Sequence, residues 1–296
     1  MPDSVLTYQV SHRTVFEYDV RIDLSHNTTC LQPRNTTFQT RRSHRLKVDP
    51  KPEFRAERMD PFGNSSSYFA VQHSHDHLDV AATSRLQVSL GTRPWEHLPE
   101  ESWTDLKEDL SKVTGNGVME RLPFSLTSSH CPTAPEFANY AESSFQQYEG
   151  AFSACSALMH RIFEELDYVP GVTTVNSSVY DILQDKRGVC QDFAHLMISC
   201  LRSLGLAARY VSGYLETLPP EGQPKMKGSD ASHAWVEVFL GNQGWVPFDP
   251  TNDCCPRAQH LVLAYGRDFS DVQPHYGIFT VAGYRPPKVE VDVSRM

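Results

Sequence analysis

The sequence predicts an α+β fold, in which a β-rich N-terminal domain precedes a half that holds helices followed by antiparallel strands. Three observations predict this class. Residues 1–95 contain short β-rich runs with no helical pattern between them. Apolar residues take up helical spacing only after Pro135, and strand-like runs return after Gly205. Such segregation is typical of α+β proteins and not of alternating α/β folds.

The N-terminal domain, residues 1–95, is expected to be an antiparallel sandwich or barrel. Its strand-like runs cover residues 6–20, 44–50, 67–75 and 78–90. Turn signals separate these runs, notably the sequence DPKP at 49–52 and the sequence DPFGN at 60–64. Of the two architectures we favour the antiparallel β-sandwich.

The second domain, residues 133–296, is expected to follow a connector at 96–132, where the periodicity fades and one short helix could lie. Helical patterns cover 136–145, 152–168, 177–185 and 189–206, the last closed by Gly205. Strands follow at 207–215, 233–240 and 244–251, and the segment 241–244 joins the last two as a hairpin. The tail at 277–293 is expected to close this domain with one or two strands.

Charge and composition exclude some classes of partner. The chain has 296 residues and a formal net charge of −9, from 27 basic and 36 acidic side chains. Nucleic acids and anionic membranes require a basic footprint, so neither is expected as a partner. No apolar run approaches the roughly 20 residues of a membrane span. The start of the sequence also lacks the pattern of a secretory signal, and we therefore expect a cytoplasmic protein.

Three residues stand out as candidates for chemistry. There are seven cysteines, an odd number at irregular spacing, so reduced thiols are expected and not a disulfide framework. One of them, Cys190, begins a helical pattern just after Gly188. His233 opens the strand-like run HAWVEVFL, and Asp249 ends the next one. If these two strands pair as a hairpin, His233 and Asp249 lie at the same edge of the sheet.

The position of each of these residues suits nucleophilic catalysis. Only the thiolate form of a cysteine attacks well, and both a helix N-terminus and a neighbouring imidazolium favour that form. A carboxylate on the far ring nitrogen of the histidine fixes its tautomer and stabilises its charged form. The backbone N–H of Cys190 would face an oxyanion that forms beside the sulfur.

Each residue alone also has other interpretations. A cysteine in an apolar helical stripe is usually a small buried hydrophobic residue. A histidine in a strand is often structural, and an aspartate before proline often belongs to a turn. Cys190 and His233 could also contribute to a zinc site. The combination of cysteine, histidine and aspartate at the ends of three elements favours the catalytic interpretation.

The same residues lie in motifs that resemble a known family. The segments GVCQDFAHL, SHAWVEVFL and GWVPFDPTN look like the three signature blocks of the transglutaminase-like superfamily. The likeness is to its bacterial branch, whose members are described as cysteine proteases. It also covers LRSLGLAARYVSGYL and GRDFSDVQP. The β-rich start, with YDV and LQPR, resembles the N-terminal domain of that branch.

This resemblance implies a papain-like α+β core and acyl transfer from an amide through a thioester. It places the nucleophile on Cys190, the histidine on His233 and the acid on Asp249. No metal or organic cofactor is required. We expect a peptide or protein substrate and favour hydrolysis of a peptide or isopeptide bond. The alternatives are transglutaminase-type cross-linking and a non-catalytic binding module that retains the fold.

Two further residues are candidates for a second oxyanion donor. The animal enzymes carry a tryptophan after the nucleophile, where this chain has Gln191, and an upstream tryptophan that serves them as a donor is missing here. Tyr168 and Gln191 are the candidates for that role, although for Tyr168 we favour the alternative of a core or turn aromatic. Asp192, in the first turn of the helix, is expected to bind free backbone N–H groups. His195 lies on another face and is expected to be structural.

Overall fold

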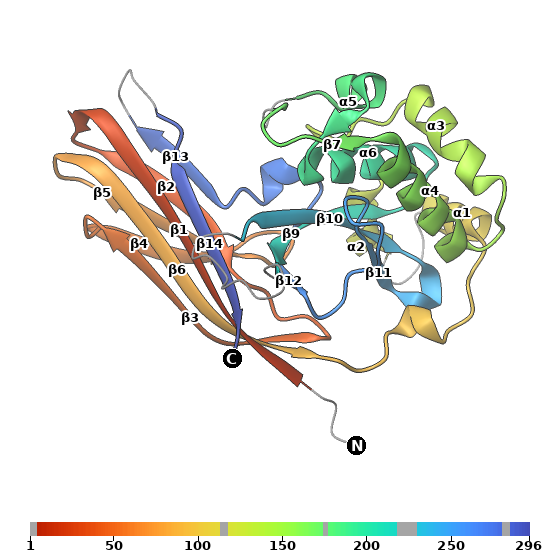
Figure 1. Ribbon diagram of the computed structural model, residues 1–296, viewed down its shortest axis with the longest axis horizontal. Coiled ribbons are helices and arrows are strands. Elements are labelled where there is room, and N and C mark those ends of the chain that lie inside the picture. Colours follow the sequence, from red (N-terminus) through yellow and green to blue (C-terminus); the bar gives the residue numbers. More distant parts are fainter. Residues whose placement is uncertain (1–4, 113–117, 174–176, 218–229, 280–284) are drawn as a thin grey trace, which may run out of the picture.

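The computed structural model describes residues 5–112, 118–173, 177–217, 230–279 and 285–296, and it confirms the predicted fold class. A sandwich of long strands lies beside a second half, in which helices cover a smaller antiparallel sheet (Figure 1). Among the described residues, no helix has the length and apolar character needed to cross a membrane.

The sandwich consists of two four-stranded antiparallel sheets. Neighbouring strands of the first are, in order, β14 (Lys288–Arg295), β1 (Val5–Ile22), β6 (His75–Ser89) and β3 (Gln39–Asp49). Those of the second are β13 (His275–Phe279), β2 (Ser25–Gln32), β5 (Ser65–Val71) and β4 (Phe54–Met59). The long strand β1 alternates buried and exposed residues, as expected for a strand with one face on a core. Phe16, Phe69 and Leu78 lie in that core.

The C-terminal tail differs from the expectation. Its two strands do not close the second domain: β14 pairs with β1, and β13 pairs with β2. Figure 1 shows both as blue strands among the red and orange strands of the sandwich. Alternating residues of β14, such as Val291 and Val293, are buried. Their apolar face therefore completes the sandwich, so both ends of the chain contribute to the same sheet.

The second half of the molecule combines helices with one four-stranded sheet. The helices are α1 (Trp103–Ser111), α2 (Val118–Arg121), α3 (Pro135–Phe145), α4 (Ala151–Glu165), α5 (Val179–Asp185) and α6 (Cys190–Ser203). The sheet has the order β11 (Trp245–Phe248), β10 (Ser232–Phe239), β9 (Ala208–Leu215) and β12 (His260–Gly266). Helix α6 is buried on nearly all sides and packs against β10, β9 and α3. It therefore occupies the centre of this half.

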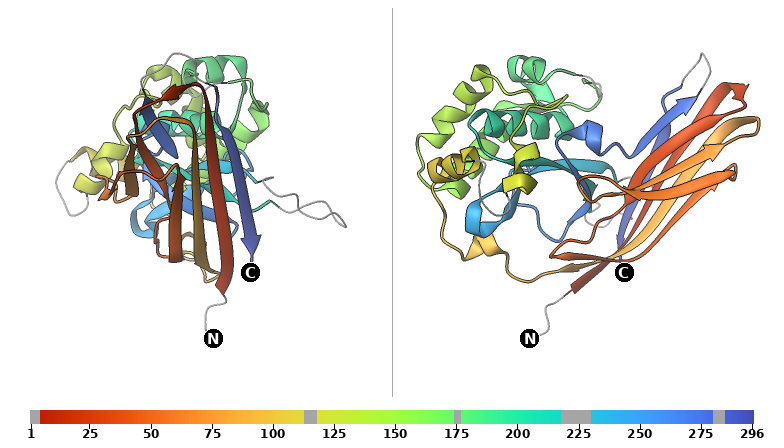
Figure 2. Two further views of the ribbon diagram at one scale, coloured as in Figure 1. Left: turned by 90° about the vertical axis from the view of Figure 1, so that its left-hand side faces the viewer. Right: turned by 180° about the vertical axis from the view of Figure 1, so that it is seen from behind.

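Side-chain amides of the sandwich bind the edge strand β12. Gln39 accepts from the N–H of Val262 at 2.9 Å and donates to its carbonyl at 2.7 Å. Asn64 makes the same pair of hydrogen bonds with Tyr265, at 2.9 and 2.7 Å. A neighbouring antiparallel strand would exchange the same two bonds. The two amides therefore take the place of a neighbouring strand on β12. Figure 2 shows the region where the sandwich meets this sheet.

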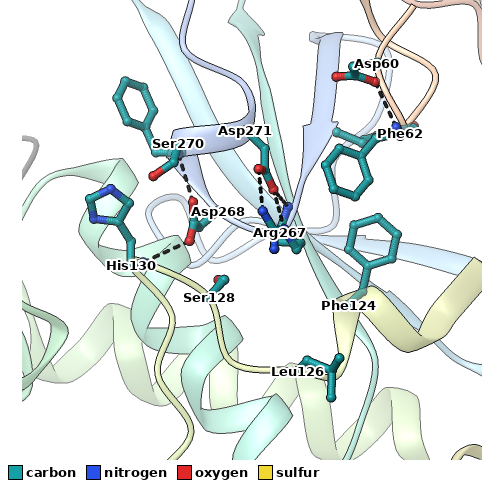
Figure 3. A network of polar contacts seen from close by, with 12 residues as sticks. Asp60, Phe62, Phe124, Leu126, Ser128, His130, Arg267, Asp268, Ser270 and Asp271 are labelled. Carbon is teal, nitrogen blue, oxygen red and sulfur yellow. Dashed lines mark hydrogen bonds and ion pairs between the residues drawn. The ribbon is translucent and has the colours of Figure 1, made fainter.

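The loop before α3 is fixed to the turn after β12 (Figure 3). The N–H groups of His130 and Ser270 each donate to the carboxylate of Asp268 at 2.9 Å. The ring of His130 stacks on the ring of His195 in α6, with centroids 5.2 Å apart. His195 is buried and its Nε2 accepts from the N–H of Phe269. Burial lowers its pKa to about 3, so the ring is neutral and structural, as expected.

Candidate active site

His233 and Asp249 are brought together by a hairpin. Strands β10 and β11 pair antiparallel, with Val236 opposite Phe248, and a short 3-10 turn at Gly241–Gln243 joins them. His233 lies near the start of β10 and Asp249 follows the last residue of β11. Nε2 of His233 is 2.7 Å from Oδ2 of Asp249. This confirms the prediction that His233 and Asp249 lie close together.

The carboxylate of Asp249 is fully buried and accepts hydrogen bonds on both oxygens. Its Oδ2 receives Nε2 of His233 at 2.7 Å, Nε2 of His260 at 2.9 Å and Nδ2 of Asn252 at 2.7 Å. Its Oδ1 receives the backbone N–H of Thr251 at 3.0 Å. Burial raises the pKa of Asp249, but the hydrogen bonds from the two histidines outweigh burial and lower it below its ordinary value. The group is therefore an anion that only accepts.

The His233 ring lies between this anion and Cys190. Burial lowers the pKa of His233, but the hydrogen bonds with Asp249 and with Cys190 raise it, with a net value of about 10. Because Nε2 is bound to Asp249, Nδ1 is the nitrogen left for Cys190. A protonated imidazole that binds a carboxylate on one side and a thiolate on the other is the arrangement that activates a cysteine nucleophile.

Cys190 is the first residue of α6, and its side chain is partly exposed. The first hydrogen bonds of this helix run from the N–H groups of Asp192 and Phe193 to the carbonyl of Val189, at 2.9 and 3.1 Å. The N–H groups of Cys190 and Gln191 therefore precede the hydrogen-bonded ladder and face the helix entrance. They can donate hydrogen bonds to an anion beside the sulfur.

Asp192 fixes the entrance of α6. It is buried, and its Oδ2 accepts from the N–H of Val189 at 2.8 Å and from the hydroxyl of Thr173 at 2.6 Å. This confirms its expected role toward the free N–H groups. The close approach requires glycine at position 188, since an added Cβ would lie 2.8 Å from the Cβ of Asp192. Gly188 and Asp192 together hold the thiol at the helix end.

The two oxyanion candidates occupy different positions. Tyr168 lies in β7 (Asp167–Tyr168), which pairs in parallel with β8 (Arg187–Gly188) just before Cys190. The Tyr168 side chain is exposed, and burial together with the charge of Cys190 raises its pKa. Its hydroxyl is therefore protonated at neutral pH and can donate a hydrogen bond. Gln191 is partly buried in the first turn of α6, and its backbone N–H also faces the entrance.

Sequence reasoning missed His260 and Asn252, which both donate to Oδ2 of Asp249. His260 is the first residue of β12, and its position against Leu215 of β9 brings it to the same sheet edge as His233. The signal was a histidine that opens the run HLVLAYG, as His233 opens HAWVEVFL. Asn252 belonged to the quoted block GWVPFDPTN but was given no role.

His233, Asp249 and His260 are also the one group of ligand-type side chains in the described residues that could hold a metal ion, with ligand atoms within 4.8 Å of one another. However, the two nitrogens lie 2.7 and 2.9 Å from a single oxygen. Ligands at tetrahedral zinc, with bonds of about 2.0–2.1 Å, are separated by roughly 3.3 Å. The distances are those of N–H···O hydrogen bonds, so the residues do not fit a metal centre.

Comparisons with known proteins agree with this architecture. The chain matches the transglutaminase-like superfamily over residues 138–250 and the bacterial transglutaminase-like N-terminal region over residues 8–87. An uncharacterized protein of Mycobacterium bovis is 36% identical over 306 residues, covering 97% of this chain and 92% of that protein. The segment that matches the transglutaminase-like superfamily, residues 138–250, contains all three predicted residues, Cys190, His233 and Asp249.

Two further comparisons concern an enzyme and a fold. A protein-glutamine gamma-glutamyltransferase of Pseudomonas aeruginosa is 33% identical over 108 residues, which cover 34% of this chain and 16% of that enzyme. The crystal structure of a candidate cysteine protease from Cytophaga hutchinsonii superposes with a TM-score of 0.77 at 20% identity. That superposition covers 99% of this chain and 91% of the other, so the two share their fold.

Proposed function

The chain belongs to the transglutaminase-like superfamily, and on this premise we propose that it transfers acyl groups from amides through a thioester on Cys190. One observation carries the proposal. His233 is bonded to Asp249 at 2.7 Å, and its pKa is raised to about 10 by Asp249 and Cys190 against the effect of burial. At neutral pH this ring is an imidazolium that can both stabilise a thiolate and donate a proton.

In the first half of the reaction, the Cys190 thiolate attacks the carbonyl carbon of the amide. The negative charge moves to the carbonyl oxygen, which the N–H groups of Cys190 and Gln191 can receive, with the hydroxyl of Tyr168 as a further donor. As the intermediate collapses, the C–N bond breaks and Nδ1 of His233 gives its proton to the leaving nitrogen. The products of this half are an amine, or ammonia, and a thioester.

In the second half, His233 is neutral at Nδ1 and can act as a base. A water molecule gives a proton to Nδ1 while its oxygen attacks the thioester carbon. The C–S bond then breaks, releasing a carboxylic acid and restoring the thiolate and the imidazolium. Asp249 does not change its protonation, because its hydrogen-bond partners keep its pKa low.

We favour hydrolysis of a peptide or isopeptide bond in a peptide or protein substrate. The partial exposure of Cys190 supports this choice, because solvent water can reach a thioester at that position. Cross-linking is the second candidate. It is supported by the similarity to the protein-glutamine gamma-glutamyltransferase of Pseudomonas aeruginosa over 34% of this chain. An amine would then replace water in the second half.

One experiment separates these reactions. The purified chain is incubated with casein and a dansyl-labelled primary amine, and the products are mapped by mass spectrometry. Peptide hydrolysis gives new chain termini, glutamine hydrolysis gives a mass gain of about 1 Da, and cross-linking gives the dansyl label on glutamine. The Cys190→Ser variant should lose whichever activity is present.

A third outcome contradicts the proposal. If casein stays intact and unlabelled while Cys190 is accessible to alkylating reagents but no more reactive than the other cysteines, the fold serves as a binding module. The Cys190→Ser variant would then bind partners as the natural chain does.

A further inference from the structure

A turn of apolar residues lies beside the start of α6. Residues 169–172 have the sequence VPGV, and the N–H of Val172 donates to the carbonyl of Val169 at 3.4 Å. Proline in the second position and glycine in the third, where Gly171 has a φ of 75°, are the signature of a type II turn. Because proline fixes its own φ, the turn keeps a defined shape.

Hydrogen bonds tie this turn to both flanks of Cys190. At its start, the N–H of Val169 donates to the carbonyl of Gly188 at 2.9 Å. Just after its end, the hydroxyl of Thr173 donates to Oδ2 of Asp192 at 2.6 Å. Gly188 and Asp192 are each two residues from Cys190, and two residues of chain span at most about 7 Å. The turn is therefore held next to the residue that carries the nucleophile.

The side chains at the two ends of the turn are apolar and exposed. Val169 and Val172 are each 37% exposed, and the neighbouring Tyr168 is 53% exposed. The first and last residues of a β-turn lie within about 7 Å of each other, so the two valines form one apolar surface. Among the described residues, no other stretch of five holds three exposed large apolar side chains. Exposed apolar residues that gather in this way, unlike those scattered singly, mark binding sites.

The strand that leads into the turn has an outer edge. Like Val169, Asp167 directs its N–H toward β8, where it donates to the carbonyl of Lys186 at 2.8 Å. Alternate residues of a strand direct their backbone groups to opposite sides, so those of Tyr168 point away from β8. Of the described strands, β8 alone pairs with β7. An extended peptide can add to the other edge of β7, where backbone pairing gives affinity and side-chain contacts give specificity.

We propose that the turn 169–172 is a subsite that takes an apolar side chain of the substrate, next to the amide that Cys190 attacks. This inference rests on the proposed acyl transfer and names its substrate class, namely peptides or proteins in which an aliphatic or aromatic residue flanks the reacting amide. The peptide backbone pairs with β7, and its apolar side chain covers Val169 and Val172. A charged side chain gains nothing there, because the turn offers no polar side chain to bind it.

Alkylation of Cys190 tests the subsite without requiring turnover. The reagents are iodoacetamide, its N-hexyl derivative, and a derivative of the same length that ends in a carboxylate. Each rate at Cys190 is followed by mass spectrometry and divided by the rate with glutathione, which removes differences in intrinsic reactivity. We expect the N-hexyl reagent to gain at least tenfold over iodoacetamide and the carboxylate reagent to gain less than threefold. A tenfold gain corresponds to about 1.4 kcal/mol, or roughly 60 Å² of apolar surface removed from water.

A double variant removes the apolar surface and keeps the thiol. Val169→Ser together with Val172→Ser should reduce the N-hexyl gain to below threefold. The rate with iodoacetamide should stay unchanged in this variant, which shows that the surroundings of Cys190 are intact. Val20→Ser is the matched control, because Val20 is 53% exposed in the sandwich and its replacement should leave both rates unchanged.

Two outcomes would overturn the subsite. In one, the N-hexyl reagent gains no more than the carboxylate reagent; in the other, its gain persists in the double serine variant. The ratios are measured at about pH 9, where an unactivated thiol also reacts, so they are decisive whether or not Cys190 is a nucleophile. Selective reaction of Cys190 with iodoacetamide at about pH 6, without an N-hexyl gain, would contradict the subsite alone. An N-hexyl gain without that selective reaction would contradict the acyl transfer and retain the apolar contact.

Discussion

Nε2 of His260 lies 2.9 Å from Oδ2 of Asp249, the oxygen that also accepts from His233. Because the carboxylate is anionic and only accepts, both rings must present an N–H group to it. His260 therefore limits the positions that Asp249 can take, and Asp249 in turn orients His233. We regard His260 as a positioning residue, since it would act on the proposed reaction only through Asp249.

Replacing His260 with leucine should slow the reaction and change its pH dependence. The hydrogen bond from His260 is one of the causes that lower the pKa of Asp249, so its loss raises that pKa. A carboxylate whose pKa is lowered by folding stabilises the folded protein at pH values above its unfolded pKa. This stabilisation is lost as the pH falls through the folded pKa. We therefore expect the acid limb of activity to move to higher pH and turnover to fall about tenfold. His260→Gln, which retains a donor, should restore most of both. An unchanged acid limb in His260→Leu would show that His260 only fills space.

The pairing of Cys190 with His233 can be measured by alkylation. With the pKa of His233 raised to about 10, its imidazolium persists through neutral pH, and Cys190 should react with iodoacetamide at pH 6. In His233→Ala the rate at pH 6 should fall at least about tenfold and recover only above about pH 8. Cys254 and Cys255 are internal controls in the same peptide map, because burial raises their pKa values to about 12 and 11. Equal pH profiles for Cys190 in the two proteins would contradict the pairing.

The raised pKa of His233 also sets an upper limit in pH. Its folded value of about 10 lies above the unfolded value of about 6.5. The stability that the protonated ring contributes is fully present below about pH 6.5 and is lost as the pH rises through about 10. Amide turnover should fall over the same upper range, because the leaving nitrogen no longer receives a proton. A turnover rate that continues to rise beyond pH 10 would exclude His233 as the acid.

The pattern of residues predicted those features that depend on local sequence. The helical stripe from Phe193 to Leu201, the hairpin of β10 and β11, and the proximity of His233 and Asp249 all follow from periodicity and turn signals. Strand β2 was missed because its inward side chains include Ser25, Asn27 and Thr29, so no apolar alternation marks it. Buried polar side chains stand in place of the expected apolar ones, and those of Ser25 and Asn27 are hydrogen-bonded within the sandwich.

Features that depend on which elements meet were less accessible to sequence reasoning. Strand β14 has the alternation of an ordinary strand, and nothing in its residues indicates that its partner is β1, at the other end of the chain. The contact of His260 with Asp249 depends in the same way on the pairing of β12 with β9. Both misses concern partners far apart in the sequence, where local patterns carry no information.

Gly188→Ala should disturb the entrance of α6. The added methyl group would lie 2.8 Å from both Cβ and Oδ2 of Asp192, closer than side-chain atoms approach. Asp192 would have to move and release the N–H of Val189, which it now binds at 2.8 Å. We expect a loss of about 1–3 kcal/mol in the free energy of unfolding, measured in urea, and slower alkylation of Cys190. A Gly188→Ala protein with unchanged stability and reactivity would mean that Asp192 can move without consequence.

Gln39→Leu tests whether side-chain amides stabilise the junction of the two halves. Gln39 is buried and exchanges two hydrogen bonds with the backbone of Val262, at 2.9 and 2.7 Å. Leucine has a similar size but leaves the N–H and carbonyl of Val262 unpaired, which should cost about 2–4 kcal/mol in the free energy of unfolding. Gln87→Leu is the matched control, because within the described part of the chain that amide bonds only the exposed Arg42, and its loss should change stability by less than about 0.5 kcal/mol. The two variants are compared by their midpoints of unfolding in urea.

Since Val262 lies two residues after His260 on the same strand, Gln39→Leu should also slow Cys190 alkylation. Equal midpoints for both variants would mean that apolar packing alone holds β12 against the sandwich.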